Sequence, residues 1–154
     1  MEELVTILSI DDSMKQNVEV KFVKSWPEDE IVSLYKAGRW WRKSYDKSTI
    51  DSIIKGSFAF AVAVDKDTGK AIGMGRLISD GVSDAYIQDF VVLPKYRGQG
   101  IGKQLFTFLL EQCLSKKILW IGLIAEPGQE TFYSPMGFKL MKGHTPMRYQ
   151  KGEA

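Results

Sequence analysis

The feature that most constrains the fold of this chain is a glycine-rich run, residues 91–105, with the sequence VVLPKYRGQGIGKQL. Residues 88–93 are apolar and β-branched enough to form a strand, which Pro94 ends. From Ile101 onward, apolar residues recur at helical spacing. Three glycines stand between the two segments: Gly98, Gly100 and Gly102. The run therefore predicts a strand, a tight turn and a helix in immediate succession.

This turn has the properties of an anion site. A helix that begins at Ile101 directs its free N–H groups and the positive end of its dipole at the turn. Arg97 and Lys103 add positive charge, which favours a phosphate or pyrophosphate. The other interpretation is a structural turn whose glycines only let the helix pack against the strand. The spacing differs from the dinucleotide motif G-x-G-x-x-G, and Gln104 occupies the place of the Walker A hydroxyl.

Length and composition predict one ordinary domain. The chain has 154 residues, of which 44% are hydrophobic and 26% charged, enough for a substantial core. A net charge of +2 argues against a nucleic-acid or membrane-surface partner. A single cysteine excludes an internal disulfide, and we find neither a signal peptide nor an apolar run of membrane-spanning length. These features together predict a cytoplasmic protein.

Hydrophobic periodicity and turn residues predict a mixed α/β chain. Ser25, Pro27 and Glu28 resemble a capping box at the start of the first helix, which would end at Gly38. A second short helix is expected at 48–54, a long one from 101 to about 115, and a short one at 129–134. The expected strands cover 18–23, 58–64, 71–78, 85–93, 118–125, 138–141 and 147–150, with a further short strand possible at 4–10.

Two motifs resemble those of the GCN5-related N-acetyltransferase (GNAT) family. Arg97, Gly100 and Gly102 fill the family's R/Q-x-x-G-x-G/A pattern, and residues 132–138, FYSPMGF, are similar to its F-Y-x-x-x-G-F segment. The resemblance covers nearly the whole chain after about residue 17, as one domain over 1–154 with a leader, 1–17, that it does not explain. It implies the acyl-CoA N-acyltransferase fold: a mixed, mostly antiparallel central sheet with one parallel, splayed strand pair, flanked by helices.

The resemblance also implies where acetyl-CoA, the acetyl donor, binds. Its pyrophosphate would lie on the glycine turn, and its acetyl and pantetheine parts would contact the backbone of the strand before the turn. The Val92 N–H is then the natural donor to the oxyanion. The implied cofactor-binding residues are Phe90, Val91, Val92, Arg97, Gly98, Gln99, Gly100, Ile101, Gly102, Lys103 and Tyr133.

Acetyl transfer to an amine needs a base for the amine and an acid for the leaving thiolate. By resemblance, Tyr133 is the candidate acid; the alternative is a structural tyrosine that packs under the cofactor. Asp89, Glu126 and a water relay remain open as the base. Asp89 lies among apolar residues, whereas Glu126 stands where many family members carry asparagine. For both carboxylates the alternative is ordinary surface charge.

The acceptor site is the least defined. Residues 38–45, GRWWRKSY, combine Trp40, Trp41 and Tyr45 with three basic residues, Arg39, Arg42 and Lys43. We interpret the aromatic residues as a wall of the acceptor site, which favours an amine with an apolar or aromatic part. The basic residues would instead favour an acceptor with a carboxylate or phosphate. Plain helix packing and, least of all, nucleic-acid binding are the alternatives.

The sequence thus predicts an enzyme that moves the acetyl group of acetyl-CoA directly to a primary amine of a small molecule or peptide. The alternative is a CoA-binding or sensing module without activity. No metal site is expected, since no cluster of histidine and cysteine has ligand spacing. His144 is expected to be structural or exposed, and Cys113 to be buried. Exposed sheet edges make a homodimer plausible.

Overall fold

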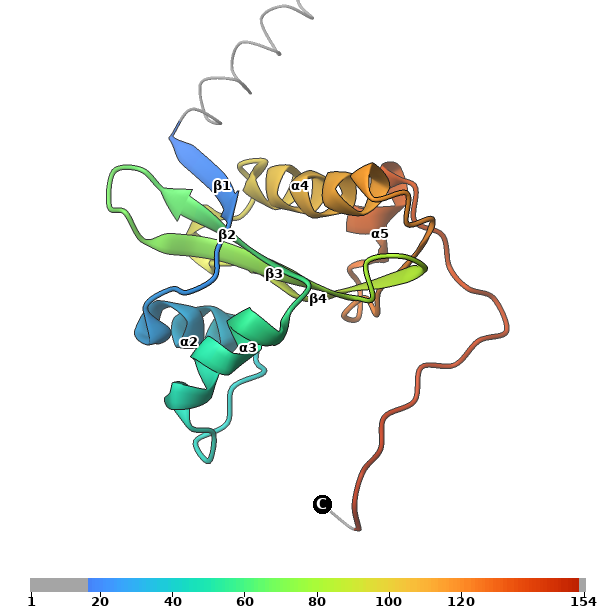
Figure 1. Ribbon diagram of the computed structural model, residues 1–154, viewed down its shortest axis with the longest axis horizontal. Helices are drawn as coiled ribbons and strands as arrows, with labels where there is room; N and C mark the ends of the chain where they lie inside the picture. The colour runs from blue at the N-terminus through green and yellow to red at the C-terminus, as the bar shows by residue number, and fades with distance from the viewer. Residues whose placement is uncertain (1–16, 153–154) are drawn as a thin grey trace, which may run out of the picture. The chain divides into compact units, whose positions relative to one another are not determined.

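The computed structural model describes residues 17–152, and within them five strands form one sheet in the order β1-β2-β3-β4-β5 (Figure 1). The first four strands pair antiparallel and β4 pairs parallel with β5. This confirms the predicted mixed, mostly antiparallel sheet with one parallel pair. The strands are β1 Val18–Phe22, β2 Ala59–Asp65, β3 Ala71–Ser79, β4 Asp84–Val92 and β5 Trp120–Gly122.

Helices cover both faces of the sheet. Figure 1 shows α4 on one side and α2 and α3 on the other. The helices are α2 Glu28–Ala37, α3 Ile50–Gly56, α4 Ile101–Ser115 and α5 Glu130–Tyr133. Because β4 and β5 are parallel, the chain between them must cross over the sheet, and α4 makes this crossover.

The core has one layer on each side of the sheet. Strand β2 is buried along both faces as far as Val64. On one side, Phe60, Val62 and Met74 pack with Ile31 and Leu34 of α2. On the other side, a Cβ added to Gly73 or Gly75 would meet leucine side chains of α4, so glycine is what lets this helix lie close to β3. The buried Cys113 is part of α4, as expected.

The chain divides into two compact units, which join in sequence between Gly122 and Leu123. The first unit carries the sheet and helices α2, α3 and α4. The second carries α5 and a 3-10 turn, Ser134–Met136, which ends at Gly137 with a φ of 96°. Aromatic rings gather within this second unit, with Tyr133 5.0 Å from Phe132 and 6.3 Å from Phe138 between ring centroids. The single domain over 1–154 stays a prediction.

The capping box predicted at Ser25 is wrong. Helix α2 begins at Glu28, and its N-cap is Pro27, with no side-chain capping bond. A different acidic side chain, Glu30, holds this end of the helix. Its Oε1 accepts hydrogen bonds from the Trp26 indole at 3.1 Å and from the Ala71 backbone N–H of β3 at 2.8 Å. A tertiary contact therefore replaces the expected local one.

The strands predicted near the C-terminus are also wrong or too long. Within the described chain, β5 covers only Trp120–Gly122 of the expected 118–125, and neither 138–141 nor 147–150 forms a strand. Leu140, Met147 and Tyr149 are 74%, 91% and 86% exposed, so these segments bury little apolar surface to stabilise strand pairing. The possible strand at 4–10 lies outside the described residues.

Candidate active site

A bulge in β4 shapes the candidate site. Gln88 pairs with Arg76 and Val91 with Met74, so two residues of β4, Asp89 and Phe90, lie opposite the one residue Gly75. Asp89 has a φ of 55°, a left-handed value that is uncommon for any residue but glycine. The extra residue changes which face of the sheet each later side chain occupies.

The bulge turns Phe90 towards α4 and Asp89 towards α2. The Phe90 ring meets Phe106 of α4 edge to face, with 5.5 Å between centroids. The Asp89 carboxylate accepts two hydrogen bonds at Oδ2, from the Tyr35 hydroxyl of α2 at 2.8 Å and from Arg76 Nε of β3 at 2.7 Å. Neither bond uses Oδ1. The side chains of the Arg76–Asp89 ion pair are 20% and 21% exposed, so the pair is shielded but still reaches the surface.

The Tyr35 hydroxyl acts as a hydrogen-bond donor that stays protonated in this arrangement. Burial raises its pKa above the usual value, and the neighbouring Asp89 carboxylate raises it further. The hydroxyl therefore keeps its proton at every ordinary pH. Arg76 has a second, longer contact, from Nη1 to the Ser57 hydroxyl at 3.4 Å. Sequence analysis missed both Tyr35 and Arg76; the only available signal was one charged residue, Arg76, within the apolar segment 71–78.

The bulge also sets the direction of the backbone at the end of β4. The Leu93 N–H donates to Ile72 O of β3 at 2.8 Å. Because successive residues of a strand direct their backbone groups to opposite sides, the Val92 N–H and C=O point away from β3. The Val92 carbonyl there accepts a hydrogen bond from Arg97 Nε at 2.8 Å.

This free side of β4 opens where β5 ends. Strand β5 pairs only with Asp84, Ala85 and Tyr86, so the part of β4 from Ile87 to Val92 has a paired strand on its β3 side alone within the described residues. A strand edge that has no neighbouring strand can bind an extended ligand. The predicted cofactor contacts Phe90, Val91 and Val92 all lie in this part.

The glycine turn follows directly. A 3-10 turn, Pro94–Tyr96, leads to Gly98 and Gly100, with φ values of 76° and 82°, and α4 then begins at Ile101. The first hydrogen bond of the helix runs from the Gln104 N–H to Gly100 O at 3.1 Å, so the N–H groups of the three preceding residues have no partner inside the helix. A Cβ on Gly98 would meet open space. With Arg97 and Lys103 beside these donors, the turn fits a pyrophosphate.

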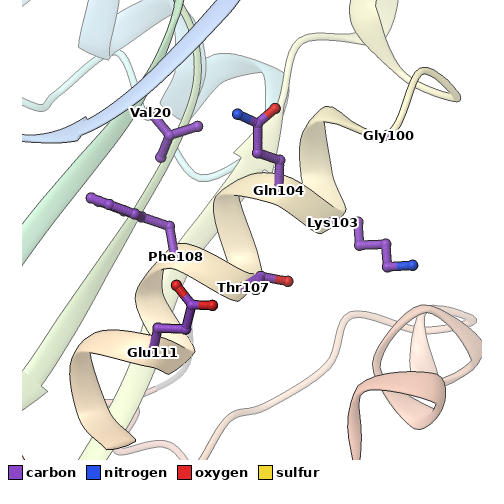
Figure 2. A pocket seen from close by; sticks show the side chains of 7 residues that line it. All are labelled: Val20, Gly100, Lys103, Gln104, Thr107, Phe108 and Glu111. Carbon is purple, nitrogen blue, oxygen red and sulfur yellow. The ribbon is translucent and has the colours of Figure 1, made fainter. Parts of the chain in front are cut away.

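An open groove of about 430 Å³ runs along one face of α4 from this turn (Figure 2). Gly100 and Lys103 lie at its start, and Val20 of β1 stands opposite the helix. Gln104 Oε1 is buried here with no hydrogen-bond partner within the described chain. The groove thus contains two of the predicted cofactor residues, and its other lining residues are Thr107, Phe108 and Glu111.

The predicted acceptor aromatics form a chain of rings that leads to Tyr35. Trp40 and Trp41 lie 6.4 Å and 6.1 Å from the Tyr35 ring, and both pack at the edge of the α2 core. Trp41 is 5.5 Å from Tyr45, which is exposed. These rings therefore pack, and through Tyr35 they connect to Asp89. The basic residues of the same segment, Arg39, Arg42 and Lys43, are exposed.

The other candidate catalytic residues, Tyr133 and Glu126, lie in the second unit. Tyr133 is partly buried and Glu126 is exposed. Burial raises the pKa of the Tyr133 phenol above its usual value, and the negative charge of Glu126 raises it further. Tyr133 is thus protonated at neutral pH, as a general acid must be. His144 is exposed, and its Nδ1 lies 3.1 Å from Lys142 O.

No cluster of three or more histidine, cysteine or acidic side chains in residues 17–152 can hold a metal ion. None of the helices in the same range is long and apolar enough to cross a membrane.

Comparison with known proteins identifies the family. A family model described as an acetyltransferase (GNAT) domain matches residues 56–140, more than half of the chain. The chain is 34% identical over 119 residues to the chloroplastic GCN5-related N-acetyltransferase 2 of Arabidopsis thaliana, covering 74% of this chain and 45% of that protein. It is 31% identical over 110 residues to the uncharacterized N-acetyltransferase ycf52 of Pyropia yezoensis, covering 71% and 63%. The chain spans about half the length of the curated relatives that it matches.

Solved structures agree with this assignment. A GNAT family acetyltransferase from Streptococcus pneumoniae TIGR4 superposes with a TM-score of 0.72 at 27% identity, covering 88% of this chain and 99% of that one. This chain therefore belongs to the GNAT acetyltransferases, the family of enzymes whose acetyl donor is acetyl-CoA.

Proposed function

We propose that this chain transfers the acetyl group of acetyl-CoA directly to a primary amine of a small molecule or peptide. The observation that carries the proposal is the β4 bulge, which joins a carboxylate facing α2 to a backbone amide at the open side of β4. The glycine turn follows within the same stretch of chain. Acetyl-CoA supplies the activated thioester in this reaction.

The glycine turn holds the cofactor in this proposal. The free N–H groups at the start of α4 bind the pyrophosphate, and Arg97 and Lys103 balance its charge. Arg97 also fixes the end of β4 through its 2.8 Å bond to Val92 O. The full set of proposed cofactor contacts is Phe90, Val91, Val92, Arg97, Gly98, Gln99, Gly100, Ile101, Gly102, Lys103 and Tyr133.

Val92 then stabilises the charge that develops during transfer. Its N–H points to the open side of β4, because the neighbouring Leu93 N–H is the one that bonds to β3. A fixed backbone donor at the carbonyl oxygen lowers the barrier to acyl transfer, since it needs no reorganisation as the charge forms.

The proton transfers need an acid and a base. Tyr133 donates its proton to the leaving thiolate, and its raised pKa keeps the phenol protonated at neutral pH before the reaction. Asp89 receives the acceptor amine through Oδ1, the oxygen that neither Arg76 nor Tyr35 uses. Glu126 is the second candidate for the base.

The acceptor in this proposal is an amine with an apolar or aromatic body. Trp40 and Trp41 provide ring surface connected to Asp89 through Tyr35, and Tyr45 forms the exposed rim.

A cytoplasmic location and a homodimer also stay predictions. Three of the relatives are named chloroplastic, so fractionation of the source cells is the appropriate test of location.

The proposal is tested by the release of CoA thiol from acetyl-CoA in the presence of a panel of amines. The panel contains arylalkylamines, alkyl diamines, amino sugars and peptides with a free N-terminus or lysine. Thiol release that depends on one amine class, with the acetylated amine identified by mass spectrometry, is the expected result. Binding of CoA in calorimetry without any thiol release would contradict acetyl transfer and favour a sensing module.

A further inference from the structure

We propose that Arg76 and Tyr35 are positioning residues for acetyl transfer, and that they act through Asp89. Neither residue carries a family motif, and they lie 13 and 54 positions from Asp89 in sequence. The inference rests on the proposed function for its catalytic consequence. Its structural basis is the hydrogen-bond network around the β4 bulge.

The bulge in β4 needs support from its surroundings. Asp89 holds a left-handed φ of 55°, which costs free energy for a residue with a Cβ. Such a conformation persists only where the surroundings impose it. Here the surroundings are two hydrogen bonds of 2.7 Å and 2.8 Å that pull the Asp89 carboxylate towards α2.

Both hydrogen bonds end on the same oxygen of Asp89. Arg76 Nε and the Tyr35 hydroxyl approach Oδ2 from β3 and from α2, and this fixes the rotation of the carboxylate. Because the rotation of the carboxylate is fixed, the direction of Oδ1 is fixed too, and Oδ1 remains a separate hydrogen-bond acceptor. Tyr35 is 7% exposed and packs in the α2 core, so one of the two donors is itself held rigidly.

The hydrogen-bond network also affects the backbone of β4. Without the extra residue in β4, the register would place Val92 N–H against β3, because backbone groups alternate along a strand. The bulge directs this amide to the open side of β4 instead. Arg76 and Tyr35 therefore set two things at once, the direction of Asp89 Oδ1 and the direction of the Val92 amide.

A double-mutant cycle tests whether Tyr35 acts through Asp89. We expect Tyr35→Phe alone to lower kcat/KM for the amine at least about tenfold, because it removes a bond to a charged group. In an Asp89→Asn background the same change should cost less than about twofold, because the partner is already altered. Independent effects, equal in the two backgrounds, would overturn the proposal.

Arg76 is tested by comparing two substitutions. Arg76→Met should lower kcat/KM for the amine at least about tenfold, and Arg76→Lys should restore part of the loss, since a cation returns with different geometry. The dissociation constant for CoA, measured by calorimetry, should rise much less than kcat/KM falls, because the glycine turn that holds the pyrophosphate is unchanged. A loss of CoA affinity as large as the loss of kcat/KM would indicate a merely structural role. Lys55→Met, which removes the exposed ion pair with Asp51, is the matched control.

The backbone readout keeps this inference separate from the proposed function. In amide hydrogen exchange or NMR of the protein without ligands, Arg76→Met and Tyr35→Phe should change the signals of Phe90, Val91 and Val92. Signals of residues 59–65 in β2 should stay as they are. Unchanged signals at the bulge in both variants would refute the positioning role, even if no amine acceptor were found.

Discussion

Replacing Gly75 by alanine tests the close packing behind the β4 bulge. Gly75 lies opposite Asp89 and Phe90, and a Cβ built there would come to 2.7 Å from Leu109 Cδ1 and 3.1 Å from Phe90 Cδ2. Leu109 is fully buried in α4, and the Phe90 ring is held edge to face by Phe106. Neither side chain can move away without displacing its own neighbours.

The expected size of the effect follows from these contacts. One inserted methyl group in a packed core costs about 1–3 kcal/mol, and the shorter of the two distances favours the upper part of this range. For a chain of this length, each kcal/mol lowers Tm by about 2–4 °C. We therefore expect Gly75→Ala to lower Tm by several degrees. Because the strain falls on Phe90, kcat/KM should fall as well.

Two glycine substitutions serve as controls, with Tm measured by circular dichroism or calorimetry. A Cβ at Gly73, also on β3 and facing α4, would find its nearest atoms at 3.3 Å, so Gly73→Ala should cost less than Gly75→Ala. A Cβ at Gly56 meets nothing within 4 Å, so Gly56→Ala should leave Tm nearly unchanged or raise it. If Gly75→Ala were no less stable than Gly73→Ala, the close packing behind the bulge would be refuted.

Four further predictions concern the turn and the two tyrosines. Gly100→Val should abolish CoA binding in calorimetry, because the φ of 82° disfavours valine and its side chain would crowd the turn; normal affinity would contradict the pyrophosphate site. Tyr133→Phe should lower kcat far more than CoA affinity, and unchanged kcat would remove Tyr133 from the mechanism. In the wild type, the raised pKa of Tyr133 should keep the phenol protonated, so its ionisation should not lower kcat between about pH 7 and 9; a loss of kcat in that range that Tyr133→Phe abolishes would contradict the raised pKa. The pKa of Tyr35 is higher in the folded state than in the unfolded state. Its contribution to the free energy of unfolding should therefore be fully present below about pH 10 and be lost as pH rises beyond that value. In denaturant melts above about pH 10, the free energy of unfolding should fall less steeply with pH for Tyr35→Phe than for the wild type.

Local sequence signals determined much of the first unit. Turn residues separate the predicted strands 58–64 and 71–78, and the run 91–105 contains the end of a strand, a turn and the start of a helix. The structure confirms each of these within a residue or two. Such signals are enough to predict these elements, because they depend on residues close in sequence whose backbone preferences do not require tertiary contacts. The candidate cofactor turn could be found for the same reason.

The same reasoning failed where a distant partner decided the outcome. Ser25 and Glu28 matched a capping pattern, but neither caps the helix. Instead, Glu30 in the first turn of α2 accepts a hydrogen bond from the Ala71 N–H of β3, which ties this end of the helix to the sheet. Residues 138–141 and 147–150 have strand composition, but a strand forms only where a neighbouring strand pairs with it. Within the described chain they have none.

The sequence by itself determined the family, the order of most elements and the glycine turn, because each is carried by short contiguous motifs. Only the tertiary structure decided the environment of Asp89. Its partners Tyr35 and Arg76 come from α2 and β3, and the extra residue in β4 becomes visible only when β4 is paired with β3. The local sequence around a carboxylate in an apolar strand is the same whether the folded protein exposes it, buries it or pairs it with a cation. Its chemistry depends on groups that folding brings from far along the chain, and no local pattern records them.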